Sequence, residues 1–459
     1  MNCKILLRPF WENQRIDHME VEFSFDTLAR NAGEELCKTT LSAYTVPGCG
    51  AEMLRVWDEK GEVEVTSTIS EPYPYKYQHY QLKRDLSGTV SVHYVVHPRP
   101  LLPGDRCAPY VDFRCEEGGG TSAGSAFLAD FGSLEGETTL SWDFSHMPEG
   151  SRGICAFGEG DVTLSAGPGL FRDCYYSIGA VKSITEGDFG VYWISEPNFD
   201  VEVIAKYTQM LFGGMQSFFH DRESVYRIFV RKDPYTHSGG SAMARCYMFG
   251  WNDTEPVSLE NKKSILAHEM VHNWPHLTDS ESEITSWYSE GTADYYSMIL
   301  PLRLGLITTK EARREIQTMT DSYYTNPTRH LSDSEAAGIC WQDWRAQKLP
   351  YGRGLLFLSN TDVKIRQATD GVRSIDDVVL SILEKRNQGI AQGNKDFLDI
   401  VREISSVDVT EDFEIMRSGG DFAPLSGGFD GHFRVIPKEM QEDGTDEMVT
   451  SYQWELITL

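Results

Sequence analysis

Residues 264–274 of the 459-residue chain read Ser-Ile-Leu-Ala-His-Glu-Met-Val-His-Asn-Trp, and this stretch decides the fold around it. Its periodicity predicts a helix over 259–274. His268 and His272 are four residues apart, so on a helix both imidazoles lie on one face, one turn apart. Both rings can then reach one Zn²⁺ at ~2.0–2.1 Å. Glu269, offset by one residue, is placed to act as a general base on a water that the metal activates, without being a ligand.

A downstream carboxylate completes the predicted metal site. A catalytic zinc of this type takes two histidines and a carboxylate and keeps one position open. Glu290 follows His272 after 17 intervening residues, enough for a turn and a return on a second helix, predicted over 283–301. Gly291 inside that helix costs about 1 kcal/mol, which favours a place where two helices approach closely. Asp294 is either a hydrogen-bond partner for a ligating histidine or a solvated helix charge.

Three segments together resemble the gluzincin metallopeptidases, the aminopeptidases with a thermolysin-like catalytic domain. The segments are His268-Glu269-x-x-His272-x-Trp274, Glu290-Gly291-x-x-x-Tyr295 and Pro350-Tyr351-Gly352-Arg353-Gly354, the last similar to a Pro-Tyr-x-Lys-Gly segment of that clan. The order of the segments 304–308, 351–356, 362–366 and 373–378 is most similar to the glycyl aminopeptidase family. The chain is also similar to the alanyl aminopeptidase and leukotriene hydrolase family. The resemblance covers roughly residues 190–425.

The resemblance implies a site and an activity. His268, His272 and Glu290 would bind one Zn²⁺ per chain, Glu269 would be the base, and Tyr351 would donate its hydroxyl to the oxyanion of the tetrahedral intermediate. A phenol beside a Lewis-acidic zinc suits that task, because it can follow the growing negative charge. A core aromatic is the other interpretation of Tyr351. The substrate implied is a peptide.

The chain departs from the family pattern in three ways. The interval between His272 and Glu290 is slightly shorter than usual, and the tail after residue 425 is too short for the peptide-binding PDZ module common in the family. The third departure concerns substrate: Gly239-Gly240-Ser241-Ala242-Met243 has alanine where a glutamate normally holds the free amine of the substrate. Gly239 and Gly240 still allow backbone to lie against a substrate edge. An ammonium buried without a partner costs several kcal/mol, so Ala242 argues against ordinary aminopeptidase specificity.

Other candidate residues carry weaker signals. We interpret His276, which follows the helix-breaking Pro275, as a rim or surface residue. His237 either lines the cleft or lies in a turn. Cys246 and Cys340 have no recognisable nucleophile context. The acidic run 439–447 is interpreted as a solvated loop.

The fold class predicted is multi-domain α+β. Alternation such as Met19, Val21, Phe23 and Phe25 with polar neighbours predicts strands, and several such runs predict an N-terminal β-sandwich over 1–185. A mostly helical, thermolysin-like zinc domain follows over 186–425, then a short extension over 426–459. Further elements are predicted as helices over 201–219, 309–320, 353–368 and 375–386, the last opened by a capping box at Ser374, and as strands over 225–230 and 450–457.

Composition limits the partners and the compartment. The chain has 42 basic and 69 acidic residues, a formal net charge of −27, so neither nucleic acid nor an anionic membrane surface is expected to bind it. The N-terminus lacks the apolar stretch of a signal peptide, and no window approaches the ~20 apolar residues of a membrane span. The nine scattered cysteines favour reduced thiols and a cytoplasmic location. The sequence leaves the oligomeric state open.

The sequence therefore predicts a zinc metallopeptidase of aminopeptidase type, acting on a peptide or small amide. Because Ala242 removes the amine anchor, the alternative is an amidase, esterase or cyclase acting on a blocked peptide or specialised metabolite. A third hypothesis is a degenerate binding or scaffold protein that keeps the fold.

Overall fold

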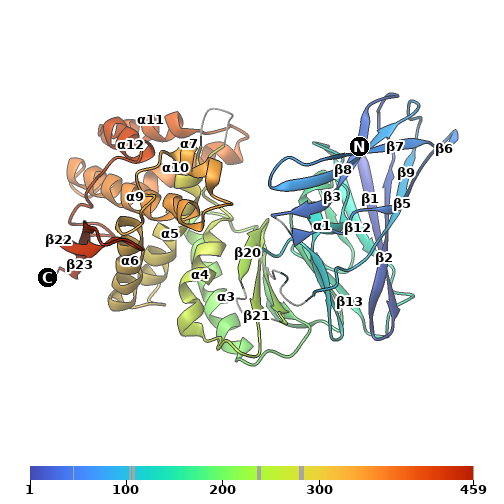
Figure 1. The fold of residues 1–459 in the computed structure, drawn as a ribbon, viewed down its shortest axis with the longest axis horizontal. Coiled ribbons are helices and arrows are strands. Elements are labelled where there is room, and N and C mark those ends of the chain that lie inside the picture. The colour runs from blue at the N-terminus through green and yellow to red at the C-terminus, as the bar shows by residue number, and fades with distance from the viewer. Residues whose placement is uncertain (45, 103–104, 106–108, 235–238, 279–283, 458–459) are drawn as a thin grey trace. The chain divides into compact units, whose positions relative to one another are not determined.

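The computed structural model describes residues 1–459 except 45, 103–104, 106–108, 235–238, 279–283 and 458–459. Strands dominate the first part of the chain and helices the last part (Figure 1). The chain forms two compact units, one made of Met1–Gln209 with Glu223–Leu259 and the other of Met210–Arg222 with Glu260–Leu459. The predicted multi-domain α+β class is confirmed.

Alternating burial forms the strands of the first unit. Met19, Val21, Phe23 and Phe25 are buried in β2, whereas the residues between them are half-buried, the period of a strand with one face in the core. The described strands before residue 180 lie in three sheets. The first has the order β15 (Val162–Leu164), β12 (Glu137–Trp142), β1 (Asn2–Glu12), β2 (Arg15–Phe25), β9 (Val90–Val96), β5 (Glu52–Asp58) and β6 (Gly61–Val63). The second is β4 (Val46–Pro47), β3 (Glu35–Ala43), β8 (Tyr75–Leu82) and β7 (Val65–Ser70), and the third is β10 (Phe113–Glu116), β11 (Gly119–Ala123), β16 (Tyr175–Gly179), β13 (Arg152–Cys155) and β14 (Gly158–Glu159).

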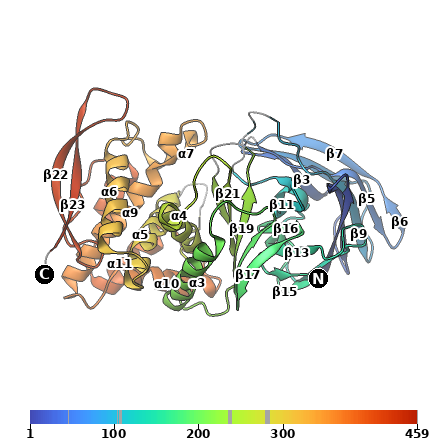
Figure 2. The ribbon, with the colours of Figure 1, turned by 90° about the horizontal axis from the view of Figure 1, so that it is seen from below.

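A mixed five-stranded sheet completes the first unit (Figure 2). Its order is β17 (Lys182–Glu186), β18 (Phe189–Trp193), β19 (Tyr226–Lys232), β21 (Cys246–Trp251) and β20 (Gly240–Met243), with β18, β19 and β21 parallel. Phe229 and Met248 of this sheet belong to the same buried cluster as Phe23 of β2. Because the core is shared, this unit extends to Leu259, whereas the sequence placed the end of the N-terminal domain at residue 185. The domain boundaries as such stay a prediction.

Helices make up most of the second unit. They are α4 (Leu259–Val271), α5 (Ser286–Arg303), α6 (Thr309–Tyr324), α7 (Asp333–Ile339), α8 (Trp344–Gln347), α9 (Leu349–Ala368), α10 (Ile375–Asn387), α11 (Asn394–Ser405) and α12 (Thr410–Arg417). The helix predicted over 201–219 is α3 (Val201–Phe218), and α1 (Gly124–Phe127) and α2 (Gly169–Arg172) are single turns. The predicted capping box is present, with Ser374 accepting a hydrogen bond at the start of α10 and Asp377 accepting one from the Ser374 N–H. None of the described helices is long and apolar enough to cross a membrane.

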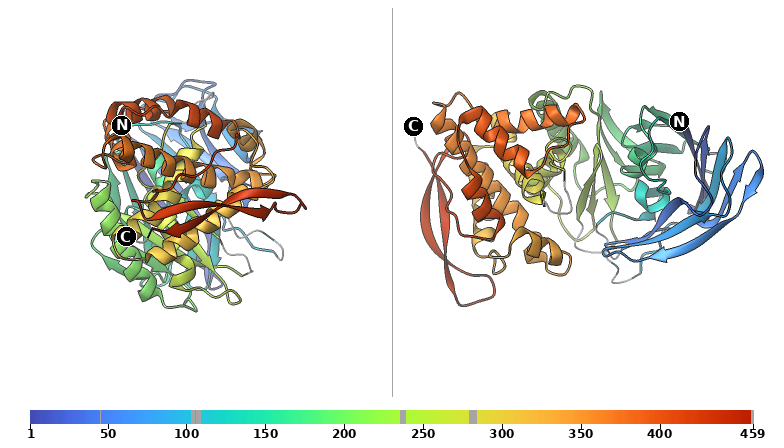
Figure 3. Two further views of the ribbon diagram at one scale, coloured as in Figure 1. Left: turned by 90° about the vertical axis from the view of Figure 1, so that its left-hand side faces the viewer. Right: turned by 90° about the horizontal axis from the view of Figure 1, so that it is seen from above.

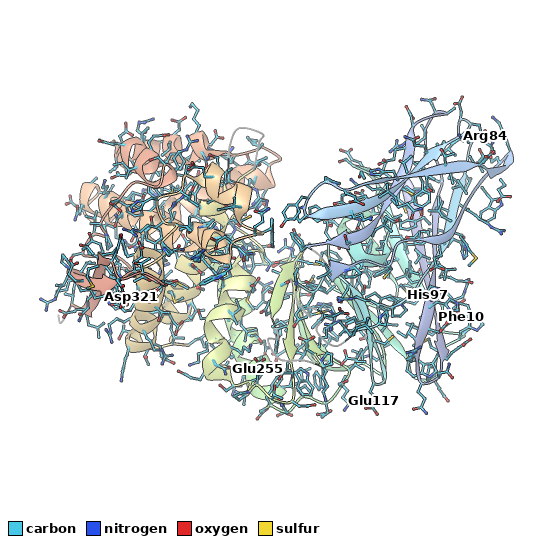
Figure 4. The ribbon with its side chains drawn as sticks, in the orientation of Figure 1. Phe10, Arg84, His97, Glu117, Glu255 and Asp321 are labelled. Atoms are coloured by element: carbon cyan, nitrogen blue, oxygen red, sulfur yellow. The ribbon has the colours of Figure 1, made fainter. Side chains whose placement is uncertain are left out.

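A hairpin of β22 (Phe433–Gln441) and β23 (Met448–Leu456) follows the helices (Figure 3). Asp321 of α6, labelled in Figure 4, accepts hydrogen bonds from Lys438 at 2.8 Å and Ser451 at 2.8 Å. Trp454 is fully buried and donates to Thr320 at 2.8 Å. The prediction of a loop over 439–447 is therefore wrong for its first three residues, which belong to β22.

Candidate metal centre

His268 lies in the last turn of α4, and His272 directly follows the helix. The helix ends at Val271, three residues before its predicted end. Pro275 explains this, because a proline ring clashes with the carbonyl of the residue four positions earlier, here Val271. Turn hydrogen bonds continue the winding of the chain past the helix end, from the Asn273 N–H to Met270 and from the Trp274 N–H to Val271. His272 therefore still faces His268, and their Nε2 atoms are 3.1 Å apart.

Glu290 of α5 meets the two imidazoles. Its Oε2 lies 3.3 Å from His268 Nε2 and 3.6 Å from His272 Nε2. In the part of the chain that the structure describes, His268, His272 and Glu290 are the group of metal-ligand side chains whose donor atoms all lie within 4.8 Å of one another. The structure thus brings together the three residues that the sequence selected as ligands.

The three separations fit a zinc ion. Ligand atoms held at about 2.1 Å from a tetrahedral zinc are ~3.4 Å from each other, and the observed distances of 3.1, 3.3 and 3.6 Å lie around that value. Glu290 Oε2 is buried and has no hydrogen-bond partner. An unsatisfied carboxylate oxygen beside two imidazole nitrogens is a donor set that a divalent cation satisfies.

Asp294 orients one of the imidazoles. It lies one turn beyond Glu290 on α5 and is 2% exposed, and its Oδ1 is 2.7 Å from His268 Nδ1. This contact places the proton of a neutral His268 on Nδ1, so that Nε2 presents its lone pair to the site. Of the two interpretations of Asp294, the structure shows a buried hydrogen-bond partner of the histidine.

Burial and the opposite charges of the cluster set the pKa values of its members. Burial lowers the pKa of His268, but the Asp294 and Glu290 carboxylates outweigh it and raise that pKa to about 10. Burial raises the pKa of Glu290, and the two imidazoles reverse this and hold it well below the usual range. Because the His268 imidazole holds its proton strongly, a metal ion that binds here must displace that proton.

Glu269 and Tyr351 lie beside the ligand cluster. Burial raises the pKa of Glu269, opposed by His268 and His272, and a carboxylate with a raised pKa is a better general base near neutral pH. Tyr351, near the start of α9, stacks on the His268 ring with the ring centroids 5.6 Å apart and the planes at 11°. Burial, and then the Glu290 charge, raise the pKa of Tyr351, so its phenol keeps the proton that it would donate.

A buried arginine fixes the start of α9. Arg353 is fully buried, lies 2.5 Å from Asp333 and donates to the carbonyls of Arg329 at 3.0 Å and Leu331 at 2.7 Å. It occupies the position of the lysine in the Pro-Tyr-x-Lys-Gly segment. Its guanidinium fork satisfies three acceptors at once, which holds the helix turn that carries Tyr351.

The remaining candidates lie elsewhere. Gly239 precedes β20, and Gly240 and Ala242 are in it, all within the first compact unit, so their assignment to substrate binding stays a prediction. His237 lies outside the described residues. His276 is exposed, Cys246 is buried and Cys340 is half-buried. Lys348, whose Nζ lies 4.6 Å from the centroid of the Tyr351 ring, is not among the residues predicted from the sequence, and its position three residues before Tyr351 was the available signal.

A known family model matches the segment that contains this site. Residues 261–351 match the family model described as M61 glycyl aminopeptidase. That segment contains the three donor residues together with Glu269 and Tyr351. The predicted resemblance to the gluzincin aminopeptidases, and to the glycyl aminopeptidases in particular, is confirmed. No curated protein sequence matches the chain.

Solved structures share the fold. An aminopeptidase N family protein from Idiomarina loihiensis aligns with a TM-score of 0.69 at 13% identity, over 95% of this chain and 79% of the other. A variant of the M1 zinc metallopeptidase from Deinococcus radiodurans, bound to a Tyr-Ser-Ala substrate, aligns with a TM-score of 0.53 at 15% identity, over 92% and 94%. Leukotriene A4 hydrolase from yeast, in complex with bestatin, gives 0.58 at 14%, over 92% and 68%. At these identities the likeness establishes the fold alone.

Proposed function

We propose that this protein is a zinc-dependent metallopeptidase of aminopeptidase type, with a thermolysin-like catalytic domain. The observation that carries the proposal is the convergence of His268, His272 and Glu290, with mutual distances of 3.1 to 3.6 Å and an unsatisfied oxygen among them. The matched family segment supports it, because that segment contains all three residues. The cytoplasmic location remains part of this proposal.

Each residue of the site receives a role from its surroundings. His268, His272 and Glu290 would hold one Zn²⁺, with Asp294 keeping His268 in the ligating tautomer. Zinc, when bound, supplies Lewis acidity that polarises a carbonyl and makes water a stronger nucleophile at neutral pH. Glu269 accepts the proton of the attacking water and passes it to the leaving nitrogen. Tyr351 donates its hydroxyl to the oxygen on which negative charge develops.

A second candidate function follows from Ala242. It lies in β20 and contributes no carboxylate where the family holds the free amine of its substrate. A zinc amidase, esterase or cyclase acting on a blocked peptide or specialised metabolite would not need that carboxylate. Both candidates use the same metal and the same base, so they differ only in substrate.

The test combines metal analysis with hydrolysis. The wild type, purified without chelator, is expected to contain one zinc per chain and to cleave peptides, and Glu269→Gln is expected to keep the zinc and lose cleavage by at least about a hundredfold. Full activity of Glu269→Gln refutes the assigned base. Protein that binds no zinc refutes the proposal and favours the scaffold hypothesis.

A paired substrate set separates the two candidate functions. The same peptide is offered with a free and with an acetylated N-terminus. Clear preference for the free amine supports an aminopeptidase that holds the amine elsewhere, and preference for the acetylated form supports the alternative. For Ala242→Glu we expect improved cleavage of the free peptide, because the variant restores the missing ammonium partner.

A further inference from the structure

Three side chains form a stripe that leads away from the metal centre. Trp344, Lys348 and Tyr351 are spaced as positions i, i+4 and i+7, which share one face of a helix. Helices α8 and α9 are joined at Lys348, whose φ of −83° and ψ of −10° are close to helical. The Lys348 N–H donates to the Trp344 carbonyl at 3.2 Å, so the winding continues across the junction.

The inner end of the stripe is Tyr351, which stacks on the metal-ligand candidate His268. Lys348 comes next, with its Nζ 4.6 Å from the centroid of the Tyr351 ring. The stripe is therefore continuous with the atoms that are proposed to do the chemistry.

Lys348 is exposed, and no carboxylate in the described part of the chain forms an ion pair with it. Around it the charged groups of the site are acidic: Glu269, Glu290 and Asp294. Lys348 therefore presents an exposed positive charge beside the acidic groups of the site. A lysine ammonium offers three hydrogen-bond donors to an anionic group.

The outer end is apolar. Trp344 is 67% exposed, one helical turn from Lys348 and two turns from Tyr351. Single exposed apolar side chains are ordinary on protein surfaces. Here the indole is aligned with a cation and a site tyrosine on one helical face, and an exposed indole is a large and rigid surface for an apolar group.

We propose that Trp344, Lys348 and Tyr351 form a substrate-binding stripe, which selects amide substrates with an anionic group beside the scissile bond and an apolar group roughly 10 Å from that bond, the rise of the seven helical residues from Tyr351 to Trp344. The inference rests on the proposed function and names its substrate class. It agrees with the alanine at position 242, because a site that recognises an anion has no need of a carboxylate there.

A charge-reversal experiment tests the stripe. N-acetylated peptides that carry Glu, Gln or Lys next to the cleaved bond, on either side of it, are compared with wild type and Lys348→Glu. We expect the wild type to prefer Glu over Lys by about tenfold in kcat/KM, mainly through KM, the size of one charged hydrogen bond. Lys348→Glu should reverse the order. Lys395→Glu, at a lysine that is 80% exposed on α11, makes the same charge change and should leave the order unchanged.

Trp344→Ala tests the outer end. It should lower kcat/KM about tenfold for peptides with an aromatic residue two or three positions beyond the acidic one, and leave the matching alanine peptides unchanged. An equal loss for both peptides overturns the apolar subsite, because a structural role would affect both alike.

A binding measurement works without turnover. Calorimetry measures how tightly two hydroxamates bind to the zinc-loaded wild type and to zinc-loaded Lys348→Glu. The two compounds are identical except that one has a carboxylate where the other has the methyl amide. The carboxylate should bind about tenfold more tightly to the wild type alone. If the wild type hydrolyses peptides but ignores their charge, the stripe is wrong and the metallopeptidase proposal stands. If it binds no zinc and hydrolyses nothing, both fail.

Discussion

Gly291 of α5 and Gly354 of α9 lie in direct backbone contact. A Cβ atom added to Gly291 would be 2.5 Å from the carbonyl carbon of Gly354, and one added to Gly354 would be 1.9 Å from the Trp287 carbonyl oxygen. The helix that carries Glu290 therefore packs on the helix that carries Tyr351 without side chains between them. This is the close approach that Gly291 predicted.

Gly354→Ala is expected to destabilise the protein by about 3 kcal/mol or more, because backbone atoms cannot move aside as a flexible side chain can. The added methyl group would also move α5 and α9 apart, so zinc affinity should fall. Urea unfolding and zinc titration measure the two effects. Gly213→Ala in α3 is the control: its Cβ meets nothing within 4 Å, and the change should be neutral or stabilise by about 0.5–1 kcal/mol. Equal stability of both variants would contradict the contact.

The contact between Asp294 and His268 supplies a second prediction. Asp294→Asn keeps the size of the side chain but weakens the bond to His268 Nδ1, so zinc affinity should fall 10–100-fold. Competition with a chelator measures it. Asp399→Asn, at an exposed carboxylate on α11, is the control for the lost charge. Unchanged affinity in Asp294→Asn would reduce Asp294 to a packing role.

The sequence was sufficient for the parts of the site that depend on local spacing. The interval of four between His268 and His272 and the carboxylate on the next helix predict the cluster, because helical geometry alone brings the imidazoles together. The fold class and the helices α3, α4, α5, α6, α9 and α10 also follow from periodicity. The end of α4 at Val271 follows from the sequence too, because the ring of Pro275 clashes with the carbonyl four residues before it.

Features that depend on tertiary packing leave little local signal in the sequence. Strand β22 has few buried residues and contains Pro437, so it carries no strand pattern of its own and forms where it pairs with β23 and meets α6. The first unit reaches Leu259 because the mixed sheet shares a core with distant strands. Lys348 belongs to no recognisable motif. Its side chain meets Tyr351 because α8 and α9 join at this residue with nearly continuous helical winding.

An ion pair between α4 and α6 makes stability depend on pH. Lys263 Nζ lies 2.9 Å from Glu311 Oε1, and Lys263 followed by the Thr308 capping contacts lowers the pKa of Glu311 to about 2. A folded-state pKa below the unfolded value gives stabilisation that is complete above about pH 4.5 and is lost as the pH falls toward 2.

Glu311→Gln isolates this charge, because glutamine can still accept the capping hydrogen bond from Thr308. The variant should be less stable than the wild type by about 0.5 kcal/mol at pH 7, the size usual for partly exposed pairs. Urea unfolding between pH 7 and 3.5 should show that the difference in unfolding free energy between wild type and variant becomes smaller below pH 4.5. If this difference in unfolding free energy grows on acidification, the Glu311 charge does not stabilise the fold in the way described.

Arg353 provides the last prediction. Its removal leaves the Asp333 carboxylate and the carbonyls of Arg329 and Leu331 without their donor, in a place where the guanidinium itself is fully buried. Arg353→Met should therefore destabilise the protein by about 3–5 kcal/mol. Arg353→Lys restores the residue of the family segment and keeps the charge, but a single ammonium does not reproduce the fork, so the loss should be about 1–2 kcal/mol. Asp333→Asn combined with Arg353→Met should cost less than the sum of the single changes, because either change alone already breaks the ion pair between the two side chains.

Since Arg353 fixes the turn that carries Tyr351, Arg353→Lys should lower kcat more than it raises KM. Unchanged kcat with lowered stability would show that Tyr351 is held by other contacts.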